Sequence, residues 1–529
     1  MPHSATAAVG RSGTQRGILA AVFGALVAQM CLTALAPLIA LFQSDLGASA
    51  TDLTWLTAAI FAPTAVLELN FGVLGDMFGR RRLVIGGQAM CAVGALVAMI
   101  AGNVGTLAVG FIFMGFGAAA LLPSTLATIA ALSTSQADRA KAIARWAVAI
   151  ALGSALSPLC GAILAQKVNL HAAFIVHVAV AIVGIVVSSL WLPDTKSPEG
   201  RTLDWGGQIL CGIGLLAFVY AVIQGADQGW SSAGVISAFV IAVVGIIAFV
   251  YVELRHPSPM FQVRLLKIPA FRAAALTGLL GMLSFLGMAY SMTLKMGPIN
   301  GKGPIALALP YVILQIIPLL LGPWLGKVLH HVSPRTLLVV GLVVMAAGQL
   351  WFVSLGEGQV GLGSITGPIL LVGVGFIFMF SSLTAAAVNS VPHDMLGMAS
   401  GATSLVRETG QTLGAAVVGA IALTHASSLI KQQVPGLGLP AKVTGQVLGI
   451  NQEAGPLAVA NVPFPAQVAK AVQPVAHSAL ERGFDVGVTV MACLSLVAAV
   501  VVAITMRGAA ARPVANLEEL EAEALEAVV

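Results

Sequence analysis

The chain has 529 residues, of which 58% are hydrophobic and only 9% are charged, and its mean hydropathy is +0.96. Soluble globular proteins carry about 25% charged residues, so this composition excludes a soluble enzyme or binding domain and indicates a helical protein that crosses a membrane many times. The formal net charge of +5 is small for so long a chain and does not require a nucleic-acid partner.

Apolar runs of about 20 residues recur along the chain, and each is long enough to cross a bilayer as a helix. We predict fourteen spans, at residues 17–42, 53–74, 83–102, 105–132, 145–166, 172–192, 206–224, 234–254, 272–294, 304–326, 336–355, 365–391, 400–424 and 484–506. The first span is too long, and is followed by too many others, to be a cleaved signal peptide.

The basic residues lie mainly on one side of these spans. With the N-terminus inside, 18 of the 26 Lys and Arg residues fall on the cytoplasmic face. The positive-inside rule therefore predicts that both termini are cytoplasmic.

The sequence offers no group of residues typical of catalysis or of cofactor binding. Its five cysteines all fall inside predicted spans, where they are most simply packing residues. CxxC, HExxH, Walker and nucleophile-elbow motifs are absent from the sequence. We therefore expect neither an enzyme nor a metal or organic cofactor.

The loop between the second and third spans combines glycines with charge. From Gly72 to Arg82 it reads GVLGDMFGRRR, which places an acid, a glycine and three arginines where a tight turn must join two helices. A weaker version follows the tenth span, where Gly322-x-x-x-Gly326-Lys327 precedes Ser333-Pro334-Arg335. Repeated halves around a central path are typical of secondary transporters.

With these residues, the chain resembles the major facilitator superfamily, specifically its fourteen-helix drug:proton antiporter branch, over essentially its whole length. The loop is similar to the superfamily signature G-x-L-x-D-x-x-G-R-[RK], which it matches at Gly72, Leu74, Asp76, Gly79, Arg80 and Arg81, with Gly75 beside the acid. The resemblance implies that Asp76 pairs across the two halves and latches the outward-facing state, while Arg80 and Arg81 hold the loop to the cytoplasmic surface. The alternative is that the arginines only obey the positive-inside rule.

A second motif lies in the fifth span. Gly153, Ser157, Pro158 and Gly161 are similar to the exporter-branch pattern G-x-x-x-G-P-x-x-G-G. Small residues and a proline there would let the helix kink and pack closely against its counterpart in the other half. A small-residue face is also common in any helix bundle, so this motif is weaker than the loop.

The resemblance implies an all-α polytopic fold in which a helix pair is inserted between two six-helix halves. We expect a cytoplasmic N-terminus at 1–16, an N-terminal half at 17–192, the inserted pair at 193–255, a C-terminal half at 256–506 and an acidic cytoplasmic tail at 507–529. The C-terminal half would include an external loop at 426–483, which we interpret as a partly ordered cap or hairpin because it mixes prolines with polar residues.

Two positions depart from the branch. The first span, around Ala28 to Pro37, lacks the acid that the branch normally carries, and Phe111 stands four residues before Gly115, where the branch normally has an arginine. The usual proton-coupling pair is therefore missing.

Ionisable residues within spans are costly in a bilayer, so each is a candidate for function. Glu68 lies in span 2, about 12 Å deeper than Asp76 at the helical rise, and Arg407 and Glu408 lie at a similar depth in span 13. The resemblance implies that these two spans face each other. Our hypothesis is that Glu68, with Glu408 as second acid, carries proton coupling through an ion pair with Arg407 that breaks in one access state. A permanent structural bridge, or no contact, are the alternatives.

The resemblance thus implies a transporter in a bacterial plasma membrane that exports lipophilic or cationic drugs by alternating access, driven by protons. Its partners would be a lipophilic small molecule, protons and the bilayer, and a periplasmic adaptor stays open. A group of Met and Phe residues would suit an adaptable apolar pocket, although residues of this kind can equally face lipid. They are Met282, Met288, Met292, Phe376, Phe378, Met379 and Phe380. The alternatives are an uncoupled facilitator or exporter of an endogenous lipid or metabolite, and a non-transporting membrane sensor.

Overall fold

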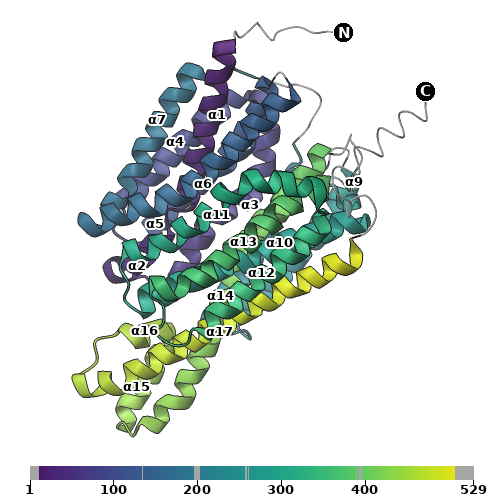
Figure 1. Cartoon of the computed structure of the whole chain (residues 1–529). Coiled ribbons are helices and arrows are strands. Elements are labelled where there is room, and N and C mark those ends of the chain that lie inside the picture. Colours follow the sequence, from purple (N-terminus) through teal and green to yellow (C-terminus); the bar gives the residue numbers. More distant parts are fainter. Residues whose placement is uncertain are drawn as a thin grey trace.

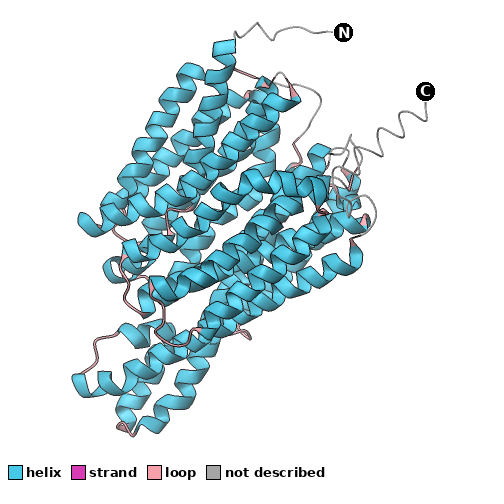
Figure 2. Cartoon of the chain, in the orientation of Figure 1, coloured by secondary structure: helices cyan, strands magenta, loops and turns pink. Residues whose placement is uncertain are grey.

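The computed structural model describes residues 11–506, apart from 134, 196–202, 257–258, 260, 389 and 392–395 (Figure 1). Every regular element in this part of the chain is a helix (Figure 2). Fourteen helical segments within it are long and apolar enough to cross a membrane, in agreement with the sequence prediction. The predicted acidic tail at 507–529 lies outside the described residues.

The N-terminal half consists of six spans. They are α1 with α2 (Arg11–Leu32 and Ile39–Leu46), α3 (Ala50–Phe78), α4 (Arg80–Met99), α5 (Val104–Leu132), α6 (Gln136–Lys167) and α7 (Ile175–Trp191). A short 3₁₀ turn, η2 (His171–Phe174), leads into α7.

The first span is interrupted, which corrects the continuous helix predicted over 17–42. α1 ends at Leu32, and the 3₁₀ turn η1 (Ala36–Leu38) separates it from α2. Pro37 lies in this turn, and proline has no N–H to donate to a helical hydrogen bond. The break matters because a Cβ added to Gly297, in the other half, would lie 3.1 Å from Ala40 Cβ in α2.

The inserted pair consists of α8 (Trp205–Gln228) and α9 (Ala233–Arg255), which pack on each other. α8 also packs on α3 and on α14 of the C-terminal half. α9 leaves large apolar side chains exposed, among them Val240, Val243 and Ile247. A helix with an apolar exposed face is suited to contact with lipid.

The C-terminal half provides the other six spans. They are α10 (Pro269–Leu294), α11 (Pro304–His331), α12 (Pro334–Ser354), α13 (Leu362–Val388), α14 (Leu396–Gln433) and α17 (Ala466–Thr505). The 3₁₀ turn η3 (Val263–Lys267) precedes α10, and a π-helical turn, η4 (Lys295–Ile299), continues it.

Two helices are much longer than a bilayer requires. α14 has 38 residues and α17 has 40, so each is about 60 Å long against a hydrocarbon core of about 30 Å. Their outer ends, the turn η6 (Val434–Leu437), α15 (Ala441–Glu453) and α16 (Gly455–Asn461) form a unit beyond the bundle, at the lower left of Figure 1. We call this unit the projecting hairpin; it occupies the region expected as the external loop at 426–483.

The projecting hairpin distinguishes the two sides of the bundle. An even number of spans places the start of α1 and the end of α17 on the same side, which we call the terminal side. α14 and α17 extend from the opposite side, which we call the projecting side. The apolar core of the N-terminal half continues into the projecting hairpin, because Leu53 and Leu56 of α3 belong to the same buried cluster as Val434 and Val459.

Candidate functional site at the seam between the halves

The two halves meet along α3 and α14, an interface that we call the seam. A Cβ on Gly401 would lie 2.8 Å from Leu69 Cδ2, and one on Gly419 would lie 3.3 Å from Thr54 Oγ1, so the two helices run antiparallel and close together. Small residues permit such an approach. Spans 2 and 13 therefore face each other, as the resemblance implies.

The halves are bound to each other on the projecting side. Tyr290 of α10 and Thr54 of α3 share a buried hydrogen bond of 2.8 Å between their hydroxyls. The backbone N–H of Ile305, at the start of α11, donates to Gln166 Oε1 of α6 (3.3 Å). Together with the contact between Gly297 and Ala40, these bonds close the space between the halves on this side.

Glu68, Arg407 and Glu408 come together at the seam, and we call them the seam cluster. Both carboxyl side chains are buried, with Glu68 8% and Glu408 3% exposed. Arg407 Nε lies 3.4 Å from Glu408 Oε1, and Glu68 interacts electrostatically with both residues of α14. The three residues that the sequence singles out thus lie within electrostatic range of one another, and the arginine pairs with Glu408 rather than with Glu68.

The seam cluster is incompletely paired. Glu68 Oε2 and Glu408 Oε2 are buried and have no hydrogen-bond partner in the structure. An unpaired buried carboxylate is costly, and two ionised carboxylates beside one guanidinium leave a net negative charge. The cluster is electrically neutral when one of its two carboxyl groups carries a proton.

In the charged loop, a single residue separates the end of α3 from the start of α4. α3 ends at Phe78, α4 begins at Arg80, and Gly79 between them has a φ of 102°. Residues with a Cβ rarely adopt this conformation. The signature glycine therefore permits the turn itself.

The charges of this loop are paired within the N-terminal half. Asp76 Oδ1 accepts hydrogen bonds from Arg80 Nη2 (2.7 Å) and Nε (3.2 Å). Arg81 Nη2 donates to the carbonyl oxygen of Ser189 near the end of α7 (2.6 Å). Gly72 and Gly75 face α5, where a Cβ on Gly75 would lie 3.5 Å from Ser124 Oγ. The hydrogen bonds of Asp76 to the described residues stay inside the loop.

The small residues of the α6 motif face α1 and α7 within their own half, while α6 also packs on α11 of the other half. A Cβ on Gly153 would lie 2.8 Å from the carbonyl oxygen of Leu26 in α1. Ser157 Oγ donates to the carbonyl oxygen of Met30 (2.7 Å) and bonds with His177 Nε2 (2.8 Å).

The remaining motif residues of α6 also lie within the half. Pro158 lies inside the helix, and a Cβ on Gly161 would lie 3.8 Å from the carbonyl oxygen of Ala173. The motif therefore fixes α6 against α1 and α7, while α6 meets α11 through Gln166.

Phe111, which replaces the expected arginine, is fully buried. Its ring lies 6.0 Å from Phe42 and 6.0 Å from Phe174, centroid to centroid. Aromatic pairs at this separation stabilise a core. The position is thus part of an aromatic cluster and offers no charge.

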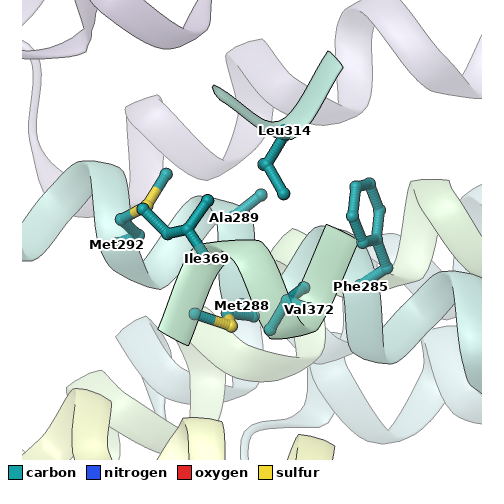
Figure 3. Close-up of a pocket in the computed structure, with 7 residues that line it drawn as sticks. All are labelled: Phe285, Met288, Ala289, Met292, Leu314, Ile369 and Val372. Carbon is teal, nitrogen blue, oxygen red and sulfur yellow. The ribbon is translucent and has the colours of Figure 1, made fainter. Parts of the chain in front are cut away.

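A small, partly open apolar pocket lies between α10, α11 and α13. Figure 3 shows the side chains that line it: Phe285, Met288, Ala289, Met292, Leu314, Ile369 and Val372. Two of the methionines expected to form a pocket are among them. Phe285, at the pocket, also packs on Phe376 of α13, with the two ring centroids 4.0 Å apart.

A second buried ion pair was not identified from the sequence. Lys295 Nζ in η4 lies 2.5 Å from Asp485 Oδ1 in α17, and the lysine side chain is 2% exposed. Nearby, Asn300 Nδ2 and the backbone N–H of Gly358 donate to Glu481 (both 2.8 Å at their shortest). The predicted last span starts at 484, which leaves Glu481 in the external loop and Asp485 just inside the span, whereas α17 begins at Ala466. Their spacing of four residues was the available signal.

Comparison with known proteins identifies the family of this chain. Residues 21–415 match the sequence profile of the Major Facilitator Superfamily. The chain belongs to this superfamily. It is therefore a transporter rather than an enzyme, and it is a multi-pass bacterial membrane protein that handles a small-molecule substrate within the lipid bilayer.

Relatives of this superfamily member match it over nearly its full length. It is 29% identical to the multidrug efflux pump LfrA of Mycolicibacterium smegmatis, over 90% of this chain and 93% of that protein. It is 25% identical to the tetracenomycin C resistance and export protein of Streptomyces glaucescens, over 93% of this chain and 91% of that protein. The crystal structure of a POT family transporter in complex with 5-aminolevulinic acid shares its fold, with a TM-score of 0.60 over 92% of this chain and 96% of that chain, at 12% identity.

Proposed function

We propose that this transporter exports lipophilic, cationic compounds across the plasma membrane in exchange for protons, by alternating access. Its similarity to a multidrug efflux pump and to an antibiotic export protein supports the direction of transport and the substrate class. The basic loop Arg80–Arg82 joins the second and third spans and therefore lies on the terminal side, so the positive-inside rule supports cytoplasmic termini. The projecting hairpin then stands outside the cell.

The observation that carries proton coupling is the charge balance of the seam cluster. Two buried carboxyl groups share one arginine, and a net charge inside a membrane protein is costly. One carboxyl group therefore holds a proton while the cluster is enclosed. A substrate cation that arrives beside the cluster supplies the second positive charge, so the proton can leave.

The position of the cluster connects this exchange to movement. The seam joins the halves, which rock against each other in alternating access. In the conformation described, the projecting side is closed by the Thr54–Tyr290 bond. We expect Asp76 to leave Arg80 and pair with the start of α14 when the transporter closes on the terminal side. The partner of Asp76 would therefore differ between the two access states.

The test is efflux of a lipophilic cation from proteoliposomes with and without an imposed pH gradient. The parent should export faster with the gradient, and Glu68→Gln should not respond to it. Glu253→Gln is the matched control, because Glu253 is an equally buried carboxyl group in α9, away from the seam. Equal gradient response in the parent and Glu68→Gln would contradict the proposal.

An uncoupled facilitator is the second candidate function. It is favoured by Phe111, which occupies the position of the usual arginine with a ring inside an aromatic cluster, and by the first span, which has no acid. Flux of the parent that is saturable but indifferent to the pH gradient would select this candidate.

A further inference from the structure

We propose that three phenylalanines, Phe285, Phe376 and Phe380, form the binding surface for a planar aromatic cation, and that Arg407 occupies the cation position of this surface when no substrate is bound. We call these residues the aromatic ladder. The inference rests on the proposed export of lipophilic cations, to which it adds a site and a chemical class of ligand.

The ladder is continuous from the apolar pocket to the seam cluster. Phe285 lines the pocket (Figure 3), and its ring stacks on Phe376 with centroids 4.0 Å apart and planes 23° from parallel. Phe376 is followed one turn later on α13 by Phe380, at 5.5 Å between centroids. Arg407 then places its Cζ 5.0 Å from the centre of the Phe380 ring.

The far end of the ladder already binds a cation. A guanidinium over an aromatic face is held by the ring quadrupole, and this attraction strengthens when water is excluded. The same guanidinium is 3.4 Å from Glu408. Phe380 and Glu408 thus together form a position suited to one positive charge. Each of the three ladder rings is only partly buried, so each has surface left for a ligand.

The near end of the ladder suits the apolar part of a ligand. Met288 and Met292 line the pocket on the same face of α10 as Phe285. Methionine side chains are flexible and polarisable, so they adapt to ligands of different shape. A planar aryl cation would therefore place its rings along Phe285 and Phe376 and its charge over Phe380.

The arrangement makes the ligand and Arg407 competitors for one aromatic face. When the ligand's charge lies over Phe380, the guanidinium moves away from the ring while it can stay paired with Glu408. A neutral ligand of the same shape has no such advantage, so the ladder should distinguish charge as well as shape.

The experiment compares two fluorescent probes, N-methylacridinium, which is permanently charged, and acridine, which has nearly the same rings and is neutral in alkaline buffer. Their affinities for the purified full-length protein in detergent are measured by fluorescence titration. Phe380→Leu should weaken N-methylacridinium about tenfold and acridine less than about twofold. Phe376→Leu should weaken both probes by a similar factor, because it removes stacking surface only.

The matched control is Phe378→Leu, because Phe378 lies on α13 between the two ladder residues but belongs to a separate apolar cluster with Ile317 and Leu325. It should leave both affinities unchanged. Arg407→Gln provides an independent measurement if Phe380→Leu does not fold. It removes the competitor and should strengthen N-methylacridinium binding about threefold or more, without a gain for acridine.

Unchanged affinity of the charged probe in both Phe380→Leu and Arg407→Gln would overturn the inference. So would an equal loss for both probes in Phe380→Leu, which would assign the ladder a packing role. These titrations use no gradient, so they are separate from the test of proton coupling. A parent that binds N-methylacridinium through Phe380 but ignores the pH gradient would refute the proposed coupling and keep the site.

Discussion

Two buried groups of charges in this transporter differ in how completely they are paired. Lys295 and Asp485, the C-half pair, are 2.5 Å apart within the C-terminal half, and the lysine also faces the Phe352 ring at 5.3 Å. The seam cluster has one arginine for two buried carboxyl groups and leaves two carboxylate oxygens without hydrogen bonds.

The difference fits the role that the proposed mechanism gives to each group. The C-half pair joins η4 to α17 inside one half, where the same neighbours are kept while the halves rock, so full pairing is an advantage. The seam cluster lies between the halves, where the surroundings change with each access state. An incompletely paired group there can exchange a proton or a partner at small cost, and intramembrane charges of this kind are functional candidates.

The largest expected effect is on stability, from breaking the C-half pair. Asp485→Leu should lower the free energy of unfolding by about 3 kcal/mol, because Lys295 is left as an unpaired buried charge. The double variant Lys295→Met with Asp485→Leu should recover most of that loss. Thermal unfolding of the purified protein in detergent measures both. A single variant as stable as the parent would show that the pair does not fix the fold.

Removing an acid from the seam cluster should have the opposite profile. Glu408→Gln should change the unfolding free energy by less than about 1 kcal/mol, because Glu68 remains as a counter-charge for Arg407 and no uncompensated buried charge is left. Gradient-driven efflux should fall by about a hundredfold, which corresponds to about 2.7 kcal/mol. Efflux rates and thermal unfolding on the same preparation test this prediction. A loss of stability as large as that of Asp485→Leu would make the seam cluster structural too.

Stability should be sensitive to a single methyl group at Gly79, the residue between α3 and α4. Gly79→Ala should destabilise the protein by about 2 kcal/mol, since its φ of 102° is strained for a residue with a Cβ. Gly86→Ala on α4 is the control, because nothing lies within 4 Å of an added Cβ there, and it should be neutral or slightly stabilising. Comparable losses in both variants, again by thermal unfolding, would remove the argument for the turn.

The smallest expected effect comes from an uncharged buried contact within the N-terminal half. Ser157→Ala removes the bonds to Met30 and His177 and should cost about 1 kcal/mol. Gradient response should be kept, because the contact does not cross between the halves. A variant with parent-like stability but altered gradient response would move α6 from the fixed part of the molecule to the coupling part.

The spans and the charged loop could be predicted because they depend on local sequence. Runs of about 20 apolar residues require a bilayer, and the glycine at 79 is the residue that its φ demands. Glu68, Arg407 and Glu408 could be selected because ionisable residues are expensive in spans. Their meeting at the seam followed from the resemblance, since the residues alone do not say which helices are neighbours.

Other features depended on packing that a single sequence does not encode. α14 and α17 carry mixed polar and apolar residues beyond their apolar runs, so hydropathy ended span 13 at 424 and started the last span only at 484, which left Glu481 outside any span. The ion pair of Arg407 with its neighbour Glu408 depends on rotamers. The aromatic ladder joins α10 to α13, and periodicity alone could not separate its rings from those that face lipid.

In the proposed mechanism, the seam cluster releases a proton when a substrate cation binds. The most direct test adds saturating N-methylacridinium to the purified protein in weakly buffered detergent solution and follows proton release with a pH indicator dye. We expect about one proton per bound cation for the parent and for Glu253→Gln, and almost none for Glu68→Gln or Glu408→Gln, because one carboxyl group beside one arginine is already neutral. Equal release from the parent and both seam variants, or no release from the parent, would contradict the proposed mechanism.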